Sequence, residues 1–359
     1  MNKMLRFLSL LSDATLSNFD LNKYPYKLTF AITYRCNYRC KHCSIWKKNP
    51  KNELSLEEIK LFIKKFPYFK WINLTGGEPF LRQDIVKIVE TFFKHSYSAY
   101  VFNTTTNGFS PSLITKKVLE ILSLDIPKLI VVVSLDGYKE LHEEIRGIPN
   151  SYRNALETFK SLKSLSKSYK NLETYFGYTI SPFNVGKFKK TFMEVKKEIK
   201  DLKPKDFHFN IYHSSAHYYA NFGLISGEEI INYVKKLKEE LNFVLKLKNA
   251  LNFLVPSRFL DSLYIKLTKK YIEKNKTPLP CKSLQSSVFI DSLGNVFPCT
   301  IFSVNLGNLR EFDYDLKKIL EQDKVRKMKI MVRSLKCPNC WTPCEAYQTI
   351  LGNIGKFNI

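Results

Sequence analysis

Three cysteines follow a short apolar segment near the beginning of the chain. They lie in TYRCNYRCKHCSIW, at Cys36, Cys40 and Cys43. Three thiolates can hold three irons of a four-iron cluster and leave the fourth iron open, and an open metal position marks a reactive site rather than a structural one. The alternative is a structural zinc site that His42 or a distant cysteine completes. The spacing therefore predicts metal chemistry at this loop and favours an iron–sulfur cluster.

The segment TGGEP, at 75–79, ends the second apolar run of the sequence. Gly-Gly followed by Pro is a common turn signal, so a plain tight turn is one interpretation. The other is a ligand site, because glycines let backbone groups approach a ligand and Glu78 supplies a negative charge for a cationic amine.

Three further polar segments end later apolar runs. They are TTTNG at 104–108, VVVSLDG at 131–137 and TYFGYTISPFN at 174–184. Each lies where a strand should end, and loops at the carboxyl ends of parallel strands carry the ligand sites of α/β folds. HEEIRG follows the second segment, and the guanidinium of Arg146 suits a carboxylate, with a surface ion pair as the alternative.

Together, these segments resemble the radical S-adenosylmethionine (SAM) superfamily over about residues 26–215. The resemblance implies a [4Fe–4S] cluster on Cys36, Cys40 and Cys43, whose open iron is chelated by SAM. It implies that the reduced cluster cleaves SAM to methionine and a 5′-deoxyadenosyl radical, which removes a hydrogen atom from the substrate. In such enzymes the cofactor does the hard chemistry, and the protein positions and shields it.

The resemblance also implies which residues contact SAM. The GGEP turn would bind the methionine amino group, and the TNG segment would lie beside SAM. Ser134 and Asp136 would contact the ribose or the carboxylate, and Arg146 would pair with the carboxylate. His42 stands at a position that packs near adenine, and Thr179 and Ile180 are candidates for a further adenine contact. The implied SAM-binding residues are His42, Gly76, Gly77, Glu78, Pro79, Thr106, Asn107, Ser134, Asp136, Arg146 and Thr179.

Five more cysteines lie in the C-terminal tail, as Cys281-x17-Cys299 and Cys337-x2-Cys340-x3-Cys344. They resemble the auxiliary-cluster extensions of radical SAM enzymes, which are called SPASM and, in a shorter form, twitch. The full SPASM pattern has seven cysteines and two clusters, so five cysteines favour one auxiliary [4Fe–4S] cluster that serves electron transfer. The first choice of ligands is Cys281, Cys299, Cys337 and Cys340, with Cys344 as a replacement or a spare thiol. A four-cysteine zinc knuckle is the alternative.

Six β-rich runs alternate with helical patterns over the first two-thirds of the chain, which predicts parallel strands with right-handed crossovers. Six units are too few for a closed eight-stranded barrel. The predicted fold class is therefore α/β, a partial (β/α)6 TIM-like barrel with a small C-terminal cluster-binding α+β domain. We expect an N-terminal helical extension at 1–25, the barrel at 26–215, a helical linker at 216–276 and a separate auxiliary-cluster unit at 277–359. The strands are expected at 26–34, 71–75, 99–106, 128–135, 174–180 and 207–212.

The chain of 359 residues has a formal net charge of +24. Its lysines are spread along many helices, which is typical of solvated faces, so we do not expect a nucleic-acid partner. The apolar run at 7–11 is too short for a secretory core, and no run is long enough to span a membrane. These absences predict a cytoplasmic protein, in which cysteines are metal-binding or catalytic thiols. A peripheral amphipathic helix at 3–12 is an alternative to ordinary core packing.

The favoured function is a radical SAM oxidoreductase. His213, His217 and Tyr218 follow the sixth strand and are catalytic candidates for proton transfer, with packing roles as the alternative. The short region before the first strand holds no peptide-recognition fold, which favours a small-molecule, sugar or lipid-linked substrate. An electron donor such as flavodoxin or ferredoxin is the expected partner. The alternatives are a peptide maturase and, from another class, a zinc and nucleic-acid binding protein.

Overall fold

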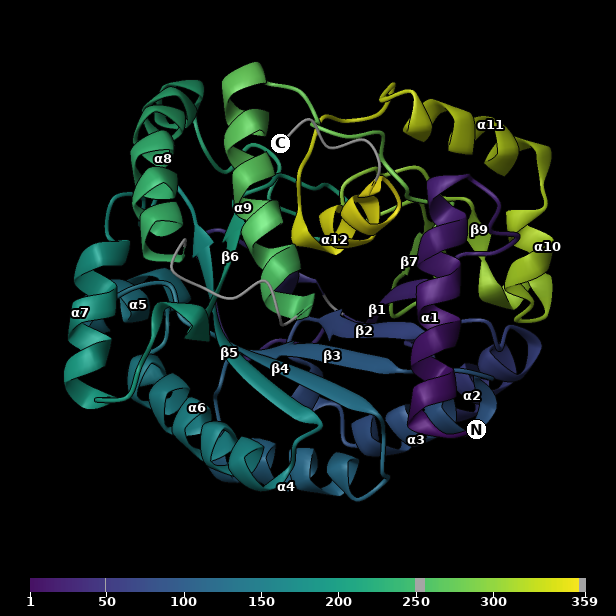
Figure 1. Ribbon diagram of the computed structural model, residues 1–359, viewed down its shortest axis with the longest axis horizontal. Coiled ribbons are helices and arrows are strands. Elements are labelled where there is room, and N and C mark those ends of the chain that lie inside the picture. Colours follow the sequence, from purple (N-terminus) through teal and green to yellow (C-terminus); the bar gives the residue numbers. More distant parts are fainter. Residues whose placement is uncertain (49, 249–255, 355–359) are drawn as a thin grey trace.

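A single curved sheet organises the protein (Figure 1). The computed structural model describes residues 1–48, 50–248 and 256–354. The sheet has nine strands in the order β6-β5-β4-β3-β2-β1-β7-β8-β9, and its first six strands pair in parallel. They are β1 (Lys27–Thr33), β2 (Trp71–Gly76), β3 (Val101–Thr106), β4 (Lys128–Ser134), β5 (Leu172–Ile180) and β6 (Phe207–Ile211). The predicted partial barrel and its six strands are confirmed.

Helices between the strands cover the outer face of this parallel sheet (Figure 1). The sequence of the first one shows why it forms. Ser55 and Glu58 make a capping box, and Ile59, Phe62 and Ile63 recur at helical spacing and are buried. Phe30 of β1 packs edge-on against Phe62, with ring centroids 6.4 Å apart. These helices are α2 (Leu56–Lys65), α3 (Ile85–His95), α4 (Pro111–Leu122), α5 (Lys139–Arg146), α6 (Ser151–Ser168) and α7 (Phe188–Glu198).

The C-terminal tail continues the same sheet. Strand β7 (Ser287–Ile290) pairs in parallel with β1, and β8 (Asn295–Phe297) and β9 (Gly307–Asn308) follow in antiparallel pairing. The strands of the C-terminal unit expected at 277–359 therefore extend the barrel sheet rather than form a separate one. The pattern SSVFIDSLGNVF indicates a hairpin, but a hairpin pattern does not reveal that its first strand also pairs with the distant β1. Burial of all four β7 residues reflects neighbours on both sides.

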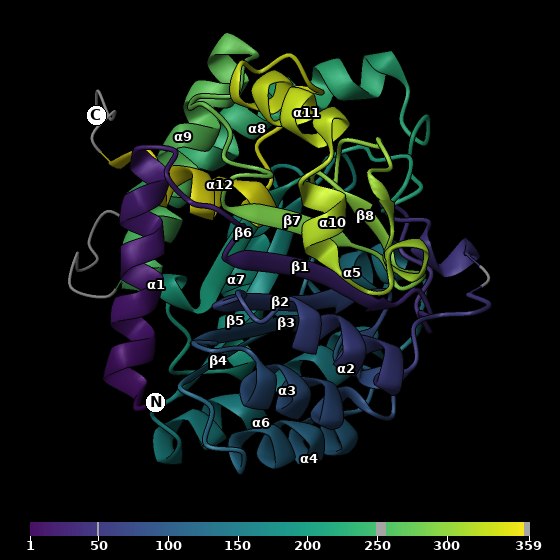
Figure 2. The ribbon, with the colours of Figure 1, turned by 90° about the vertical axis from the view of Figure 1, so that its right-hand side faces the viewer.

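The rest of the tail is helical and lies above β1 (Figure 2). Helix α12 packs against α1 and α9, and Tyr264 of α9 stacks on Trp341 with ring centroids 6.3 Å apart. The tail helices are α10 (Leu316–Leu320), α11 (Asp323–Arg333) and α12 (Pro343–Leu351), after the pair α8 (Gly227–Lys248) and α9 (Pro256–Lys274). Single 3-10 turns are η1 (Ile45–Lys47), η2 (Pro79–Leu81), η3 (Pro204–Asp206) and η4 (Leu309–Phe312).

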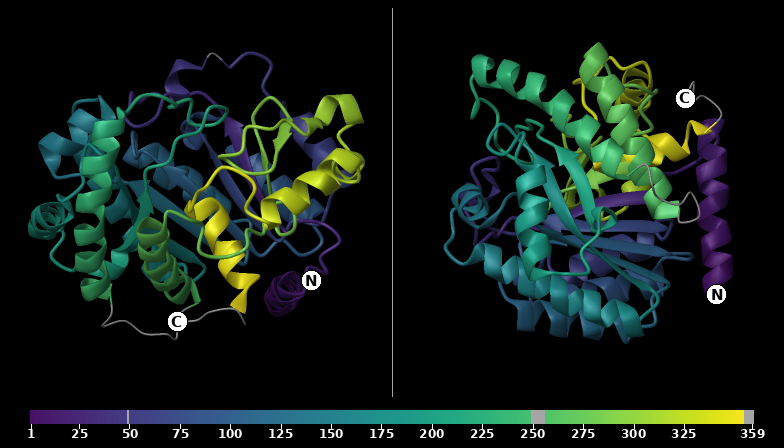
Figure 3. Two further views of the ribbon diagram at one scale, coloured as in Figure 1. Left: turned by 90° about the horizontal axis from the view of Figure 1, so that it is seen from above. Right: turned by 60° about the vertical axis from the view of Figure 1, so that its left-hand side comes forward.

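Helix α1 (Lys3–Asn18) runs along the outside of the molecule (Figure 3). It lies at the amino-terminal ends of the strands, where Arg6 donates to the Ala99 carbonyl over 3.0 Å and Lys70 donates to the Ser9 carbonyl over 3.1 Å. Across 1–48, 50–248 and 256–354, no helix has both the length and the apolar character that crossing a membrane requires.

Candidate functional site

The predicted cluster loop lies at the carboxyl end of β1. Backbone hydrogen bonds fasten it to α5, from Arg39 N to Arg146 O over 3.1 Å and from Lys41 N to Ile145 O over 2.8 Å. Burial raises the pKa of the Cys36 thiol to about 12 and that of Cys43 also to about 12. A buried thiol stays protonated until a cation or a metal stabilises its thiolate, so these thiols suit metal binding.

The GGEP turn packs directly against this loop. A Cβ atom on Gly76 would lie 2.0 Å from the Thr33 carbonyl oxygen, and one on Gly77 would lie 2.2 Å from the Arg35 carbonyl oxygen. Gly77 N donates to Thr33 O and Glu78 N donates to Arg35 O, each over 2.8 Å. The sequence pattern predicts that these glycines admit a ligand. Their closest neighbour in the structure is the backbone that leads into the cysteines.

The buried Glu78 carboxylate connects the GGEP turn with the end of β3. It accepts hydrogen bonds from Phe80 N, Thr106 Oγ1 and Asn107 N, at 3.1, 2.9 and 2.6 Å. Burial raises its pKa to about 7, although these hydrogen bonds favour the charged form. The Asn107 amide in turn donates to Asn37 Oδ1 over 2.9 Å. The GGEP turn, the TNG segment and the cysteine loop therefore form one connected unit.

Asp136 and Arg146 form a buried ion pair beside the cysteine loop. Arg146 Nη2 lies 2.6 Å from Asp136 Oδ2, and the two side chains are 10% and 0% exposed. Burial alone would raise the pKa of Asp136, but the guanidinium holds it below its usual value. Arg146 Nη1 also contacts Cys40 Sγ at 3.6 Å, and Asp136 Oδ1 accepts from Thr179 N over 3.1 Å. The alternative prediction for Arg146 is an ion pair on the protein surface. An ion pair is present, but it is buried, and both of its members, Arg146 and Asp136, are predicted SAM contacts.

Three buried nitrogen atoms in and beside this ion pair lack a hydrogen-bond partner within the described residues. They are His42 Nδ1, His142 Nε2 and Arg146 Nε. Each unpaired buried polar atom costs about 1–3 kcal/mol. Burial also lowers the pKa of His42 to about 4, so its ring is neutral. Neutral rings and a spare guanidinium nitrogen next to three thiols fit a polar ligand and an iron–sulfur cluster.

Electrostatic effects connect four of the tail cysteines: a thiolate on Cys281 or Cys337 would raise the pKa of the Cys340 thiol, and a thiolate on Cys281 or Cys340 would raise that of Cys299. Burial, the largest cause, raises the pKa of Cys281 to about 12. Cys344 faces elsewhere: burial raises its pKa to about 11, and the ammonium of Lys27 on β1 opposes that rise. The four neighbouring thiols are Cys281, Cys299, Cys337 and Cys340.

The thiols of neither set converge on a single metal-ion position. No three His, Cys, Asp or Glu side chains in the described segments gather closely enough to hold one metal ion. A four-iron cluster suits such spacing, because each thiolate binds a different iron.

An aromatic cluster lies between the two cysteine sets. Tyr218 packs against Tyr219 and Phe289, with ring centroids 4.6 and 5.0 Å apart, and Cys43 contacts the cluster. Burial is the largest cause that raises the pKa of Tyr218, and negative charges on Cys344 and Cys43 would raise it further. Its hydroxyl is 2.7 Å from Thr75 Oγ1, beside the GGEP turn. Tyr218 therefore reaches the predicted SAM site.

The two predicted histidines face the tail instead. His217 Nε2 lies 3.0 Å from the Cys299 carbonyl oxygen and its Nδ1 lies 2.9 Å from Ser303 Oγ. The His213 ring is 6.1 Å from that of Tyr271 on α9. Burial lowers the pKa of both histidines to about 4. These contacts support the packing alternative, in which His217 fastens the barrel to the loop of Cys299.

Two asparagines outside the predicted site position its loops. Asn184 Nδ2 donates to the carbonyls of Asp136 and Thr179, each over 2.9 Å, and Asn221 Nδ2 donates to the His42 carbonyl over 3.0 Å. Both follow strands, but asparagine is common in loops, so no sequence signal distinguished them. The remaining predicted contacts are also at this edge: Ser134 ends β4 and Pro79 begins η2.

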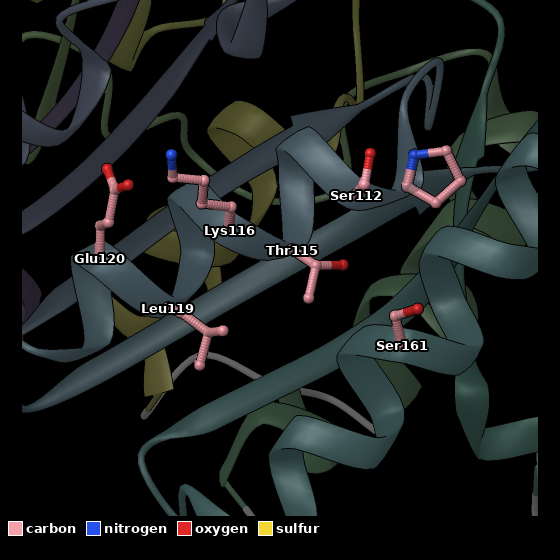
Figure 4. A pocket seen from close by; sticks show the side chains of 7 residues that line it. Ser112, Thr115, Lys116, Leu119, Glu120 and Ser161 are labelled. Carbon is pink, nitrogen blue, oxygen red and sulfur yellow. The ribbon is translucent and has the colours of Figure 1, made fainter.

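A shallow surface hollow lies elsewhere, between α4 and α6 on the outer face of the barrel (Figure 4). None of the predicted cluster or SAM residues lines it. Its lining consists of Pro111, Ser112, Thr115, Lys116, Leu119, Glu120 and Ser161.

Comparisons with known proteins agree with this geometry. Residues 30–195 match the radical SAM superfamily, and residues 281–345 match the SPASM iron–sulfur cluster-binding domain. An AdoMet-dependent heme synthase of Methanosarcina barkeri (strain Fusaro / DSM 804) is 25% identical over 267 residues, which cover 73% of this chain and 72% of that protein.

Solved structures share the fold. The anSMEcpe structure with bound AdoMet has a TM-score of 0.57 at 18% identity, covering 92% of this chain and 97% of that one. Streptococcus suis SuiB bound to S-adenosylmethionine has a TM-score of 0.55 at 14% identity, covering 88% of this chain and 71% of that one. The chain belongs to the radical SAM superfamily, as an enzyme that binds SAM and a [4Fe–4S] cluster and carries a C-terminal SPASM domain for auxiliary iron–sulfur chemistry.

Proposed function

We propose that the chain is a SAM-cleaving oxidoreductase whose primary cluster is held by Cys36, Cys40 and Cys43. The observation that carries this proposal is the connected unit in which Glu78 and Asn107 tie the ends of β2 and β3 to the cysteine loop that follows β1. When bound, the reduced cluster and SAM supply the radical that removes hydrogen from the substrate. The protein contributes a preorganised and buried site.

Three of the implied SAM contacts have a defined environment: Arg146, His42 and Glu78. Arg146 supplies positive charge beside Cys40 and would bind the SAM carboxylate through its unpaired Nε. His42 is neutral and buried, which suits a contact with adenine. Glu78 uses three of its roughly four acceptor positions inside the protein, so one position remains for the amino group of SAM.

One auxiliary [4Fe–4S] cluster would use Cys281, Cys299, Cys337 and Cys340. Their mutual proximity supports this set, whereas Cys344 interacts with Lys27 instead. The electron that a substrate radical would give up on oxidation would then have a route from the barrel to the auxiliary cluster, past the aromatic cluster around Tyr218, which contacts Cys43. Flavodoxin or ferredoxin would supply the electron that starts each cycle.

For the substrate we favour a small molecule. The similarity to a heme synthase at 25% identity supports this class more than the peptide-bound structures do, which share 18% identity or less. A peptide is the second candidate, because two such structures with TM-scores of 0.56 and 0.57 contain peptide ligands, the Cp18Cys peptide and the precursor peptide SuiA.

Deuterium transfer separates these candidates. The reduced and reconstituted protein is incubated with SAM and a cell extract from deuterium-grown cells, and deuterium is measured in 5′-deoxyadenosine. We expect label transfer that survives treatment of the extract with protease and removal of macromolecules. Label that disappears after protease treatment would contradict the small-molecule proposal and establish a peptide substrate.

A further inference from the structure

Helix α1 turns an apolar stripe away from the protein. Four of its side chains recur at intervals of one, three and three residues and are 42% to 64% exposed. This spacing places them on one side of a helix. The opposite side is buried against the protein at Ala14 and Ser17. The stripe consists of Met4, Leu5, Leu8 and Leu11.

The outward side of α1 also lacks charge. Helical geometry places Ser12 and Thr15 on the same side as the stripe and places Lys3, Arg6 and Asp13 on other sides. A surface helix usually directs charged residues to solvent and one apolar side to the core. The stripe on α1 is a second apolar side, which does not pack against the rest of the described protein. No segment in the described ranges covers it.

Cations predominate around this helix. Three carboxylates beside α1 are paired: Asp13 with Lys70 at 2.6 Å, Asp20 with Lys282 at 2.7 Å and Asp125 with Lys3 at 2.7 Å. Two further cations lie beside these pairs. Arg333 Nη2 is also 2.7 Å from Asp20 Oδ2, and the guanidinium carbon of Arg6 lies 4.6 Å from the centroid of the Phe93 ring. The cations are Lys3, Arg6, Lys70, Lys282 and Arg333, of which Lys70 and Lys282 are only 14% and 2% exposed, and the carboxylates are Asp13, Asp20 and Asp125.

We propose that this face of α1 docks on the surface of an anionic lipid bilayer. The stripe would enter the boundary between headgroups and acyl chains, and the cations that reach solvent beside it, Lys3, Arg6 and Arg333, would attract anionic headgroups. Charge favours a bilayer over a second copy of the chain, because two proteins of net charge +24 repel each other. No membrane-spanning helix is needed for such peripheral binding.

The position of α1 fixes how the enzyme would sit on the membrane. Helix α1 lies at the amino-terminal ends of the strands, whereas the cysteine loop lies at the carboxyl end of β1 (Figure 2). The bilayer would therefore face the amino-terminal ends of the strands, and the candidate active site would lie on the opposite, aqueous side.

Vesicle sedimentation tests this proposal with the full reconstituted chain. The probes are phosphatidylcholine vesicles with and without phosphatidylglycerol. We expect binding to the anionic vesicles that weakens as salt is added. The double variant Leu5→Glu/Leu8→Glu should bind about tenfold more weakly or worse, because two inserted apolar side chains become charged.

The matched control is Leu61→Glu/Met193→Glu, which adds the same charge on α2 and α7, where the replaced side chains are 46% and 56% exposed. It should bind like the wild type. Both double variants should keep the wild-type iron content and thermal midpoint. Absence of wild-type binding, or an equal loss in both double variants, would overturn the proposal. So would a concentration-dependent dimer in light scattering that only Leu5→Glu/Leu8→Glu abolishes, without binding to vesicles.

Discussion

Arg146 and Asp136 lie 2.6 Å apart in a buried ion pair, and the same guanidinium reaches Cys40 Sγ at 3.6 Å. One arginine on α5 therefore links the cysteine loop with the end of β4. This link explains why two residues implied as separate SAM contacts act together: the charge of Asp136 holds Arg146 in place beside the thiols.

Removal of Arg146 should destabilise the protein more than removal of the whole pair. Arg146→Gln leaves Asp136 buried without a countercharge, at an expected cost of about 3–5 kcal/mol in the free energy of unfolding. Asp136→Asn/Arg146→Gln should cost less, because no charge remains buried. Urea denaturation measures both. Arg153→Gln, which breaks an exposed pair with Glu157, is the control and should change little. Equal stability of Arg146→Gln and wild type would disprove this role.

Gly77 should tolerate no side chain. A Cβ atom there would lie 2.2 Å from Arg35 O, so Gly77→Ala must move the cysteine loop. We expect a loss of about 1–3 kcal/mol in stability and weaker retention of the primary cluster. Gly227→Ala, at the beginning of α8 with no atom within 4 Å, is the matched control and should be neutral or slightly stabilising. Denaturation and iron analysis measure both variants, and similar behaviour of the two would refute the close-packing argument.

Iron analysis of cysteine variants distinguishes which tail cysteines bind the auxiliary cluster. The wild type should hold about eight irons, in two four-iron clusters. Cys340→Ala should lower this to about four, whereas Cys344→Ala should retain about eight, because Cys344 faces Lys27. The opposite pattern would place Cys344 in the auxiliary cluster and exclude Cys340 from it.

Glu78 should make stability depend on pH. Its pKa rises from 4.5 to about 7 on folding because of burial. Between these values the folded protein binds a proton that the unfolded chain has released, so this stabilisation is complete below pH 4.5 and is lost as the pH rises through 7. The slope is about 1.4 kcal/mol per pH unit. Glu78→Gln should lack this component when unfolding is measured without SAM, and an unchanged slope would show that another group is responsible.

The strands and the cysteine loop could be predicted because their signals are local. Runs such as KLIVVVS and the spacing Cys36-x3-Cys40-x2-Cys43 identify a strand and a loop without knowledge of the rest of the chain. The pairing of β7 with β1 could not be predicted in this way, since it joins segments about two hundred and sixty residues apart.

The roles of individual loop residues were also beyond the sequence. His217 looks like a catalytic histidine in the one-dimensional pattern, but its ring nitrogens lie against Cys299 O and Ser303 Oγ. Asn221 carries no signal at all, although it holds the His42 carbonyl. Such roles depend on which loops meet at the carboxyl edge of the sheet, and only the folded arrangement contains that information.

The most direct test of the central claim is SAM cleavage by the reduced and reconstituted protein, measured as 5′-deoxyadenosine and methionine. The wild type should produce both. Cys36→Ala, Cys40→Ala and Cys43→Ala should each abolish production, whereas Cys344→Ala should form the products at a rate comparable to wild type. Cleavage that persists in any of the three loop variants would contradict the assignment of Cys36, Cys40 and Cys43 to the catalytic cluster.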